Sequence, residues 1–147
     1  MFENKMELKF SAVSQNQAFA RVTVAAFATQ LNPTVAEITE IKTAVSEAVT
    51  NAIIHGYDSD DTREVSINAA LNENELFIEV IDFGKGINDI DQAREPLYTS
   101  KPDEERSGMG FTVMEEFMDC VIVESNKEGT TIKMRKTIGG GEPGKNS

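Results

Sequence analysis

Several features are scarce or missing in this sequence, and each absence narrows the class of protein. No apolar run is long enough to cross a bilayer, and the first residues lack a signal-peptide pattern, so we expect a cytoplasmic protein. The single cysteine, Cys120, has no partner for an internal disulfide, which fits a reducing compartment. Its apolar neighbours at 121–123 predict a buried, structural side chain.

Basic residues are also scarce. Lys and Arg number 14 against 25 Asp and Glu, which gives a formal net charge of −11. Binding to a nucleic-acid backbone depends on clustered basic side chains, so this balance disfavours direct nucleic-acid binding and is compatible with a basic protein partner. The sequence contains no Gly-x-x-x-x-Gly-Lys-Ser/Thr and no eukaryotic-type protein-kinase motifs, which excludes P-loop proteins and that kinase fold.

What the sequence does contain is enough for one domain. With 147 residues, 39% of them hydrophobic, we expect a single core built from residues 1–137, and a disordered tail at 138–147. Hydrophobic periodicity predicts strand 6–10, helices 14–31 and 34–56, strands 64–71 and 76–81, a short helix in 88–94, a long loop at 97–110, helix 111–119, and strands 120–125 and 130–136.

This order of elements predicts an α+β fold. We expect a single-domain, two-layer sandwich in which a mixed, mostly antiparallel sheet is covered by helices on one face. Two capping boxes mark the starts of the first two helices: Ser14 with Gln17, and Thr34 with Glu37. The first strand has one apolar face and an unpaired edge, so we interpret it as an interface.

The second helix carries a pattern of polar residues beside its apolar stripe. Glu47, Asn51 and His55 recur every four residues and therefore share one side of the helix. Glu47 could accept a proton, and Asn51 could offer a neutral oxygen to a hard cation such as Mg²⁺. Taken alone, this segment is better explained as the polar flank of a surface helix.

Two glycine-containing stretches follow. In Asp82-Phe-Gly-Lys-Gly86, the carboxylate ends a strand and could accept a hydrogen bond from an exocyclic amine such as that of adenine. Gly84 and Gly86 would allow positive φ and close approach to a flat ring, although a tight turn explains this motif equally well when it stands alone.

The second glycine stretch, Arg106-Ser-Gly-Met-Gly-Phe111, opens a helix after the long loop. Glycines before a helix N-terminus expose backbone N–H groups to an anion. Arg106, and Lys101 in the loop, could neutralise phosphate oxygens. A lone Gly-x-Gly is weak evidence for such a site.

In this order, the three stretches resemble the nucleotide-binding (GHKL, or Bergerat-fold) domain shared by gyrase, Hsp90, histidine kinases and MutL. Residues 47–56 are similar to its N box, residues 82–86 to its first glycine box, and residues 107–111 to its second. Thr130, after Gly129, stands where that family places a hydroxyl near adenine. The resemblance covers about residues 6–137.

Residues 40–56 and 106–111 narrow the resemblance to one group of that family. They look like those of the anti-sigma serine kinases of Gram-positive bacteria, above all the ones that hold the sporulation factor sigma F. It implies a homodimer that binds ATP and Mg²⁺ and holds sigma F inactive when ATP-bound. It also implies that the protein phosphorylates a serine of an anti-anti-sigma protein, releasing ADP, and that the 97–110 loop acts as a lid.

The same resemblance implies a role for each site residue. Glu47 would be the general base, and Arg21, on the first helix, would contact both protein partners. Gln17 departs from the family pattern, because an acid is expected there. The remaining residues would hold ATP·Mg²⁺: Asn51 as the magnesium ligand, Asp82, Gly84, Gly86 and Thr130 around adenine, and Lys101, Arg106, Ser107, Gly108 and Gly110 around the phosphates.

Other interpretations remain. The chain could be a nucleotide-gated sigma-binding module without kinase activity, although such a module has no need for the carboxylate of Glu47. It could also be an anti-sigma kinase for a stress-response sigma factor. An ATPase of the gyrase or chaperone type, or a histidine-kinase fragment, is disfavoured, because the sequence shows neither a transducer domain nor a phospho-accepting dimerisation helix.

Overall fold

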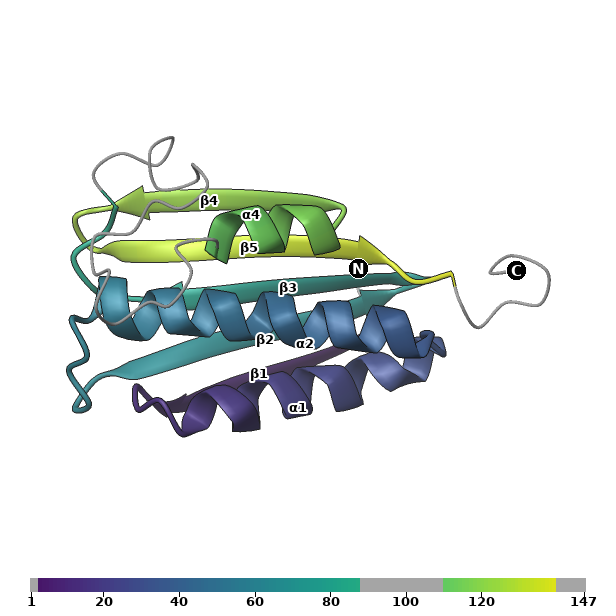
Figure 1. The fold of residues 1–147 in the computed structure, drawn as a ribbon, viewed down its shortest axis with the longest axis horizontal. Coiled ribbons are helices and arrows are strands. Elements are labelled where there is room, and N and C mark those ends of the chain that lie inside the picture. Colours follow the sequence, from purple (N-terminus) through teal and green to yellow (C-terminus); the bar gives the residue numbers. More distant parts are fainter. Residues whose placement is uncertain (1–2, 88–109, 140–147) are drawn as a thin grey trace.

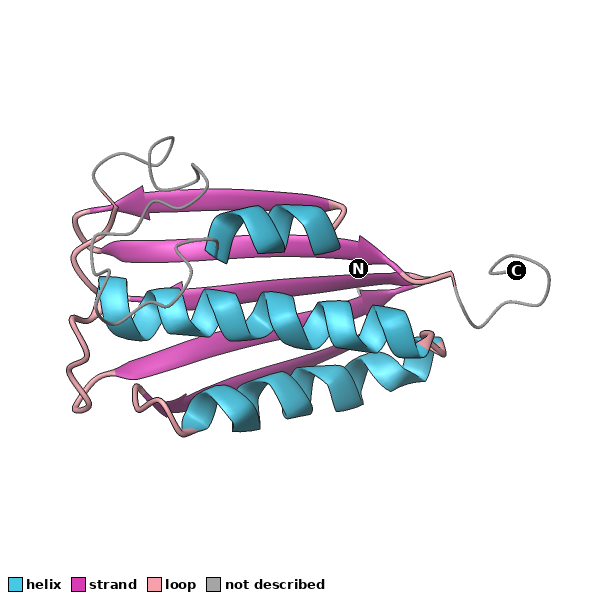
Figure 2. Cartoon of the chain, viewed as in Figure 1, coloured by secondary structure: helices cyan, strands magenta, loops and turns pink. Residues whose placement is uncertain are grey.

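The computed structural model describes residues 3–87 and 110–139 of the 147. Figure 1 shows their arrangement, and Figure 2 the same view by type of element. In chain order the elements are β1 (Asn4–Ser11), α1 (Asn16–Ala28), the 3-10 turn η1 (Thr29–Leu31), α2 (Val35–Thr50), the π-helix η2 (Asn51–Gly56), β2 (Glu64–Asn72), β3 (Glu75–Asp82), α4 (Gly110–Phe117), β4 (Cys120–Asn126) and β5 (Gly129–Thr137).

The strands form one five-stranded sheet in the order β1-β2-β3-β5-β4. All four pairings in it are antiparallel. Helices α1, α2 and α4 lie together on one face (Figure 1), which confirms the expected two-layer α+β sandwich. The sheet was expected to be mixed, but the pairings that the structure describes contain no parallel pair. Strands β1 and β4 form the edges of the sheet that the structure describes, so the first strand has the open edge that the sequence predicted.

The core lies between the helices and the sheet. One face of α2 is completely buried through Ile41, Ala44, Val45, Ala48 and Val49. The facing strands alternate buried and accessible residues with a period of two. Each fully buried Val or Ile side chain stabilises the fold by about 1.5–3 kcal/mol relative to exposure, so packing holds α2 from Ile41 to Val49.

The two predicted helix starts have different outcomes. The Thr34–Glu37 capping box is present, with Glu37 N–H donating to Thr34 Oγ1 at 3.0 Å and Thr34 N–H donating to Glu37 Oε1 at 2.9 Å. The Ser14–Gln17 capping box is wrong. The N-cap of α1 is Gln15, which makes no side-chain cap bond, and the Gln17 amide instead donates to α2.

The end of the second helix also differs from the prediction. A regular α-helix was expected through Gly56, but the last six residues form the π-helix η2. Its wider turns continue past the end, since Tyr57 N–H donates to Ala52 O at 3.0 Å and Ser59 N–H to Ile53 O at 2.8 Å. The wider winding carries Gly56 so close to β3 that a Cβ there would lie 2.7 Å from the carboxylate of Asp82.

Smaller differences concern the chain ends and the cysteine. Ile138 is buried and its N–H donates to Asn74 O at 2.8 Å, so the packed chain reaches one residue beyond the expected boundary of 137. Cys120 is half-buried rather than buried. The predicted helix at 88–94, the predicted loop up to residue 109 and residues 140–147 of the predicted tail lie outside the described residues.

Candidate functional site

Segments far apart in the sequence meet at one end of the sheet. There the end of η2 approaches the loop after β3, and Lys85 N–H donates to Gly56 O at 3.1 Å. Asp82, the last residue of β3, pairs with Thr130 near the start of β5. Helix α4, whose first residue is Gly110, packs against α2 on the same face of the sheet (Figure 1). The structure therefore brings the end of the N-box segment against the first glycine stretch.

Asp82 is the buried acid at the centre of this end. Its side chain is on the core side of the sheet, only 3% of the residue is exposed, and Oδ1 accepts a hydrogen bond from Gly84 N–H at 2.9 Å. Burial raises the pKa of Asp82 to about 6, against the opposing effect of backbone hydrogen bonds from Gly84 and Thr130. A carboxylate in this setting gains from a further hydrogen-bond donor, such as an amine on a flat ligand.

Two glycines let the backbone close around this acid. A Cβ at Gly84 would lie 1.9 Å from Gly56 O, so the space is taken by the end of η2. A Cβ at Gly129, where φ is +145°, would lie 2.1 Å from Asp82 O. Gly86 has the positive φ that the sequence predicted, at +81°. The close approach at Gly84 is thus to another part of the protein and not to a ligand.

Thr130 contributes a buried hydroxyl beside Asp82. It is 3% exposed, and its Oγ1 lies 2.7 Å from Ser125 Oγ. Ser125 Oγ also accepts a hydrogen bond from Ile87 N–H at 2.7 Å. The hydroxyl pair thereby ties the β4–β5 hairpin to the chain that leaves the first glycine stretch. Sequence reasoning missed Ser125, although its position opposite Thr130 across a predicted hairpin turn is a usable signal.

Tyr57 holds the loop after β3 and was also missed. Its hydroxyl donates to Glu64 O at 2.6 Å and accepts from Phe83 N–H at 2.7 Å. The guanidinium of Arg63 lies 4.6 Å from the centre of the tyrosine ring and donates to Phe83 O at 2.6 Å. Burial raises the pKa of Tyr57, so its hydroxyl stays protonated as a donor. No pattern in the sequence pairs Tyr57 with Phe83, because the contact is between separate elements.

Glu47 and Asn51 lie one turn apart, as predicted. Both are half-buried, and the N–H of Asn51 bonds to the carbonyls of Glu47 and Ala48. Asn51 is also the first residue of η2, so the change from α to π winding occurs at the predicted magnesium ligand. His55 lies within the same π-helix, four residues after Asn51.

The other predicted residues are placed only in part. Arg21 is half-buried on α1, and Gly110 is the first residue of α4. The remaining four predicted phosphate-site residues lie outside the described residues: Lys101, Arg106, Ser107 and Gly108.

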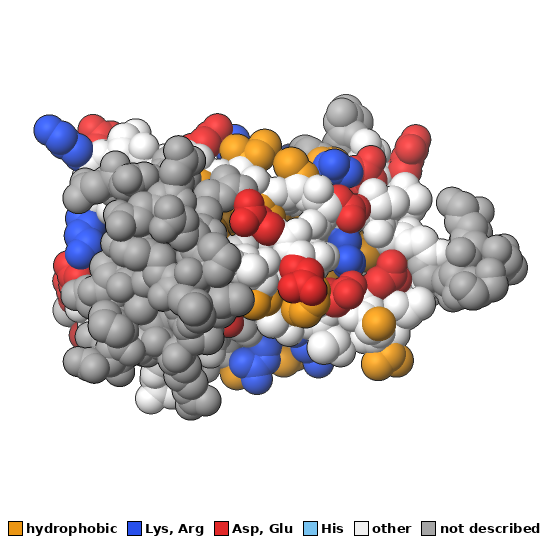
Figure 3. Space-filling view, turned by 45° about the horizontal axis from the view of Figure 1, so that its top comes forward, with side chains coloured by type: hydrophobic (Ala, Val, Ile, Leu, Met, Phe, Trp, Pro, Cys, Tyr) orange, Lys and Arg blue, Asp and Glu red, His pale blue; other side chains and the backbone are white. Residues whose placement is uncertain are grey.

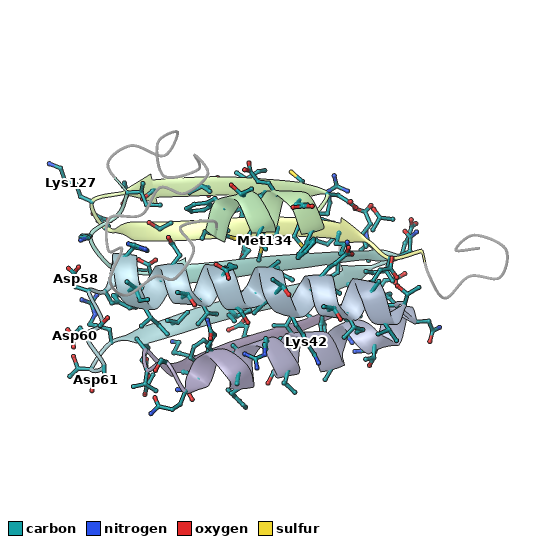
Figure 4. The ribbon with its side chains drawn as sticks, in the orientation of Figure 1. Lys42, Asp58, Asp60, Asp61, Lys127 and Met134 are labelled. Carbon is teal, nitrogen blue, oxygen red and sulfur yellow. The ribbon has the colours of Figure 1, made fainter. Side chains whose placement is uncertain are left out.

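Charge around the site is mainly acidic. Figure 4 shows Asp58, Asp60 and Asp61 together in the turn after η2, and Asp58 forms an ion pair with Lys85 at 3.0 Å. Acidic side chains are also spread over the face seen in Figure 3. Within 3–87 and 110–139, no group of three or more His, Cys, Asp or Glu could hold a metal ion. A single neutral oxygen from Asn51 suits Mg²⁺, which keeps water and phosphate oxygens as its other ligands.

Comparisons with known proteins agree with this geometry. Residues 10–136 match the histidine kinase-like ATPase domain family. The anti-sigma F factor of Clostridium acetobutylicum is 63% identical over 92% of this chain and 95% of its own length. The anti-sigma F factors of Clostridium botulinum (strain Eklund 17B) and Geobacillus kaustophilus are each 60% identical over 92% of this chain, and over 96% and 93% of their own lengths.

Solved structures share the fold. The RsbU and RsbW domains of a Mycobacterium tuberculosis protein superpose with a TM-score of 0.67 at 19% identity, covering 92% of this chain and 32% of that one. A histidine kinase domain from Erythrobacter litoralis superposes with a TM-score of 0.54 at 16% identity, covering 83% of this chain and 61% of its own.

The chain therefore belongs to the histidine kinase-like ATPase domain family and, within it, to the anti-sigma F factors. Membership of this family implies ATP as the ligand of the site. In the part of the chain that the structure describes, no helix is long and apolar enough to span a membrane.

Proposed function

We propose that this protein is a nucleotide-dependent anti-sigma factor that holds sigma F when ATP is bound and phosphorylates a serine of an anti-anti-sigma protein. The observation that carries the proposal is the 60–63% identity to anti-sigma F factors over 92% of the chain. The geometry of the candidate site supports it. A sigma factor as partner would place the protein in the cytoplasm.

The adenine end of the site is assigned to Asp82 and its neighbours. The carboxylate would accept a hydrogen bond from the exocyclic amine of adenine, and Thr130 would supply a hydroxyl beside it. Gly84, Gly86 and Gly129 let the backbone pack closely around this end of β3, because a Cβ at each would meet backbone atoms of a neighbouring segment. This fit rests on the burial of Asp82 and on its position at the end of β3.

The transfer end of the site is assigned to α2 and the following helix. ATP·Mg²⁺, when bound, supplies the phosphoryl group and neutralises charge on it. Asn51 would hold the magnesium ion. Glu47 would orient the substrate serine and receive the proton that its hydroxyl gives up. Gly110 starts α4, whose N-terminal N–H groups favour an anion. We assign the phosphate contacts of Lys101, Arg106, Ser107 and Gly108 from the family resemblance alone.

Partner binding is assigned to α1 and to the edge of the sheet. Arg21 is accessible enough on α1 to meet an acidic group of either protein partner. Strand β1 ends the described sheet at one side, and its free edge could pair with the same strand of a second protomer. An antiparallel pairing of this kind is self-complementary, as a twofold homodimer requires.

The test is a reconstituted transfer assay. The protein is mixed with labelled ATP·Mg²⁺ and a candidate anti-anti-sigma protein, beside the variants Glu47→Gln and Glu116→Gln. Glu116 is exposed near the end of α4 away from the site, so it is a matched control. We expect serine phosphate on the candidate, a loss of about 10²–10⁴-fold with Glu47→Gln, and no change with Glu116→Gln.

The same samples, sedimented with sigma F, test the binding half of the proposal. We expect a complex that contains two copies of this chain and forms with ATP but not with ADP. Binding of sigma F with no phosphate transfer, even to the true antagonist, would leave a nucleotide-gated binding module instead. Failure to bind sigma F while a different sigma factor binds would point to a stress-response function.

A further inference from the structure

We infer that Gln17 is a positioning residue for Glu47: its carboxamide clamps α1 onto the catalytic end of α2. The inference rests on the proposed function. It concerns the one residue of the first helix that departs from the family pattern, and it gives that residue a role inside the protein rather than at a partner surface.

The contacts are direct. Gln17 Nε2 donates to Ser46 O at 3.0 Å, and it also donates to the side-chain hydroxyl of Thr50. Both hydrogens of the amide group are thus directed at α2. Gln17 is half-buried between the two helices, where a donor without partners would be costly. This arrangement explains why Gln17 does not cap its own helix.

The two acceptors flank the proposed catalytic residues. Ser46 immediately precedes Glu47, and Thr50 immediately precedes Asn51. Thr50 is the last residue of α2 before the winding changes to π. A junction between two windings has more than one way to pack, so a fixed external contact at this point selects one orientation for the side chains on either side.

The clamp also connects this junction to the proposed partner surface. Gln17 and Arg21 are four residues apart on α1 and therefore lie on the same side of it. A partner protein that offers an acidic group to Arg21 would act on the turn of α1 that also carries Gln17. Glu47 would then be held in its working orientation more firmly when a partner is bound.

The experiment compares Gln17→Ala and Gln17→Met with Gln15→Ala. Methionine keeps the length of glutamine but has no hydrogen-bond donor, so it removes both bonds to α2. Gln15 is exposed and makes no side-chain cap bond, which makes it a control of the same residue type. We expect kcat for serine phosphorylation to fall about tenfold in both Gln17 variants, with KM and ATP affinity within about twofold, and no effect of Gln15→Ala.

A conservative series at the acceptor gives a second readout. Thr50→Val removes the hydroxyl and should lower kcat as Gln17→Ala does, and Thr50→Ser should restore it. Combining Gln17→Ala with Glu47→Gln should lower kcat no further than Glu47→Gln alone, because the clamp acts through Glu47. A further tenfold loss in the double variant would overturn the inference.

Hydrogen exchange separates this inference from the proposed function. In Gln17→Ala we expect the amides of residues 47–56 to exchange about tenfold faster, with those of β3 and β5 unchanged. Faster exchange throughout the sheet would show general destabilisation and overturn the inference, as would no change at all. If the unsubstituted protein transferred no phosphate, the proposed function would fail, and the local exchange pattern would still decide whether the clamp exists.

Discussion

The two ends of the sheet treat a buried charge in opposite ways. At the end away from the site, Lys136 is 8% exposed, pairs with Glu40 at 3.0 Å and donates to Phe117 O at 2.6 Å. At the site end, Asp82 is 3% exposed and is held by backbone N–H groups, and burial raises its pKa to about 6. One charge is neutralised within the fold, whereas the other gains from an outside donor.

The backbone conformation also differs between the two ends of the sheet. The far end uses regular devices: the capping box of Thr34 and Glu37, and the bond from Thr137 N–H to Asp119 Oδ2 at 2.7 Å. The site end uses a π-helix and a glycine at φ +145°. The π-helix and this glycine thus lie at the end where a ligand is proposed to bind, and costly conformations are often found at functional sites.

Substituting a glycine at each end of the sheet should give the largest difference in the free energy of unfolding. In Gly129→Ala the new methyl group would lie 2.1 Å from Asp82 O at a φ that alanine rarely adopts. We expect the free energy of unfolding to fall by about 3 kcal/mol. At the far end, a methyl group on Gly139 would meet nothing within 4 Å. Gly139→Ala should therefore change the free energy of unfolding by less than about 0.5 kcal/mol. Urea unfolding of both variants measures these changes in the free energy of unfolding. Equal losses in the two variants would contradict the expected difference between the two ends.

Breaking the charge pair at the far end should cost somewhat less and spare the site. Lys136→Met removes the partner of Glu40 and the hydrogen bond to Phe117 O, and we expect a loss of about 2 kcal/mol of unfolding free energy. Lys133→Met is the control, because Lys133 pairs with Glu124 at 3.1 Å at an exposed position. Titration with an ATP analogue at a temperature where both variants are folded should give unchanged affinity. Weaker nucleotide binding by Lys136→Met would show that the two ends are coupled.

Removing the buried acid at the site end should have a smaller effect on stability, and one of opposite sign. The pKa of Asp82 is raised from 3.8 to about 6, so the folded state binds a proton that the unfolded state has released between these pH values. Its contribution to stability therefore falls as pH rises from 3.8 to about 6, and stays low above that. Asp82→Asn should remove this fall and stabilise the protein at pH 7 by about 1 kcal/mol.

The same variant should lose ligand binding. An amide at residue 82 offers adenine a poorer acceptor, so we expect affinity for an adenine nucleotide to fall about tenfold or more at pH 7. Calorimetric melts from pH 4 to pH 8 and nucleotide titrations measure the two effects on one sample. Reduced stability at pH 7, or unchanged affinity, would argue that Asp82 serves the fold rather than a ligand.

Much of the fold could be predicted from the sequence because its signals are local. Alternation in β2, β3 and β5 and the Thr34–Glu37 capping box depend on residues close together in the chain, and those predictions are confirmed. The failures come from long-range contacts. Gln17 matches the capping-box pattern, but its amide is used by α2, 29 residues further along the chain.

Local patterns in the sequence predicted single residues of the candidate site. Their assembly into one site was predicted only through the family resemblance. The order of the three stretches identified the family, which the comparisons confirm. The roles of Glu47, Asn51 and Asp82 remain predictions, although the structure gives Asp82 the burial that its role requires. The supports of the site, Tyr57 and Ser125, act through contacts between separate elements, so the spacing within any one element does not reveal them.

The π-helix η2 has a consequence for how this protein can vary. Its wider winding accommodates more chain per turn than an α-helix does, so the reach from Asn51 to Gly56 depends on the number of residues between them. Losing one residue from 52–55 would let the segment wind as an ordinary α-helix, with good local hydrogen bonds. It would also draw Gly56 away from Asp82 and rotate everything that follows. Conservative substitutions at 52–55 should therefore be tolerated more readily than a deletion there.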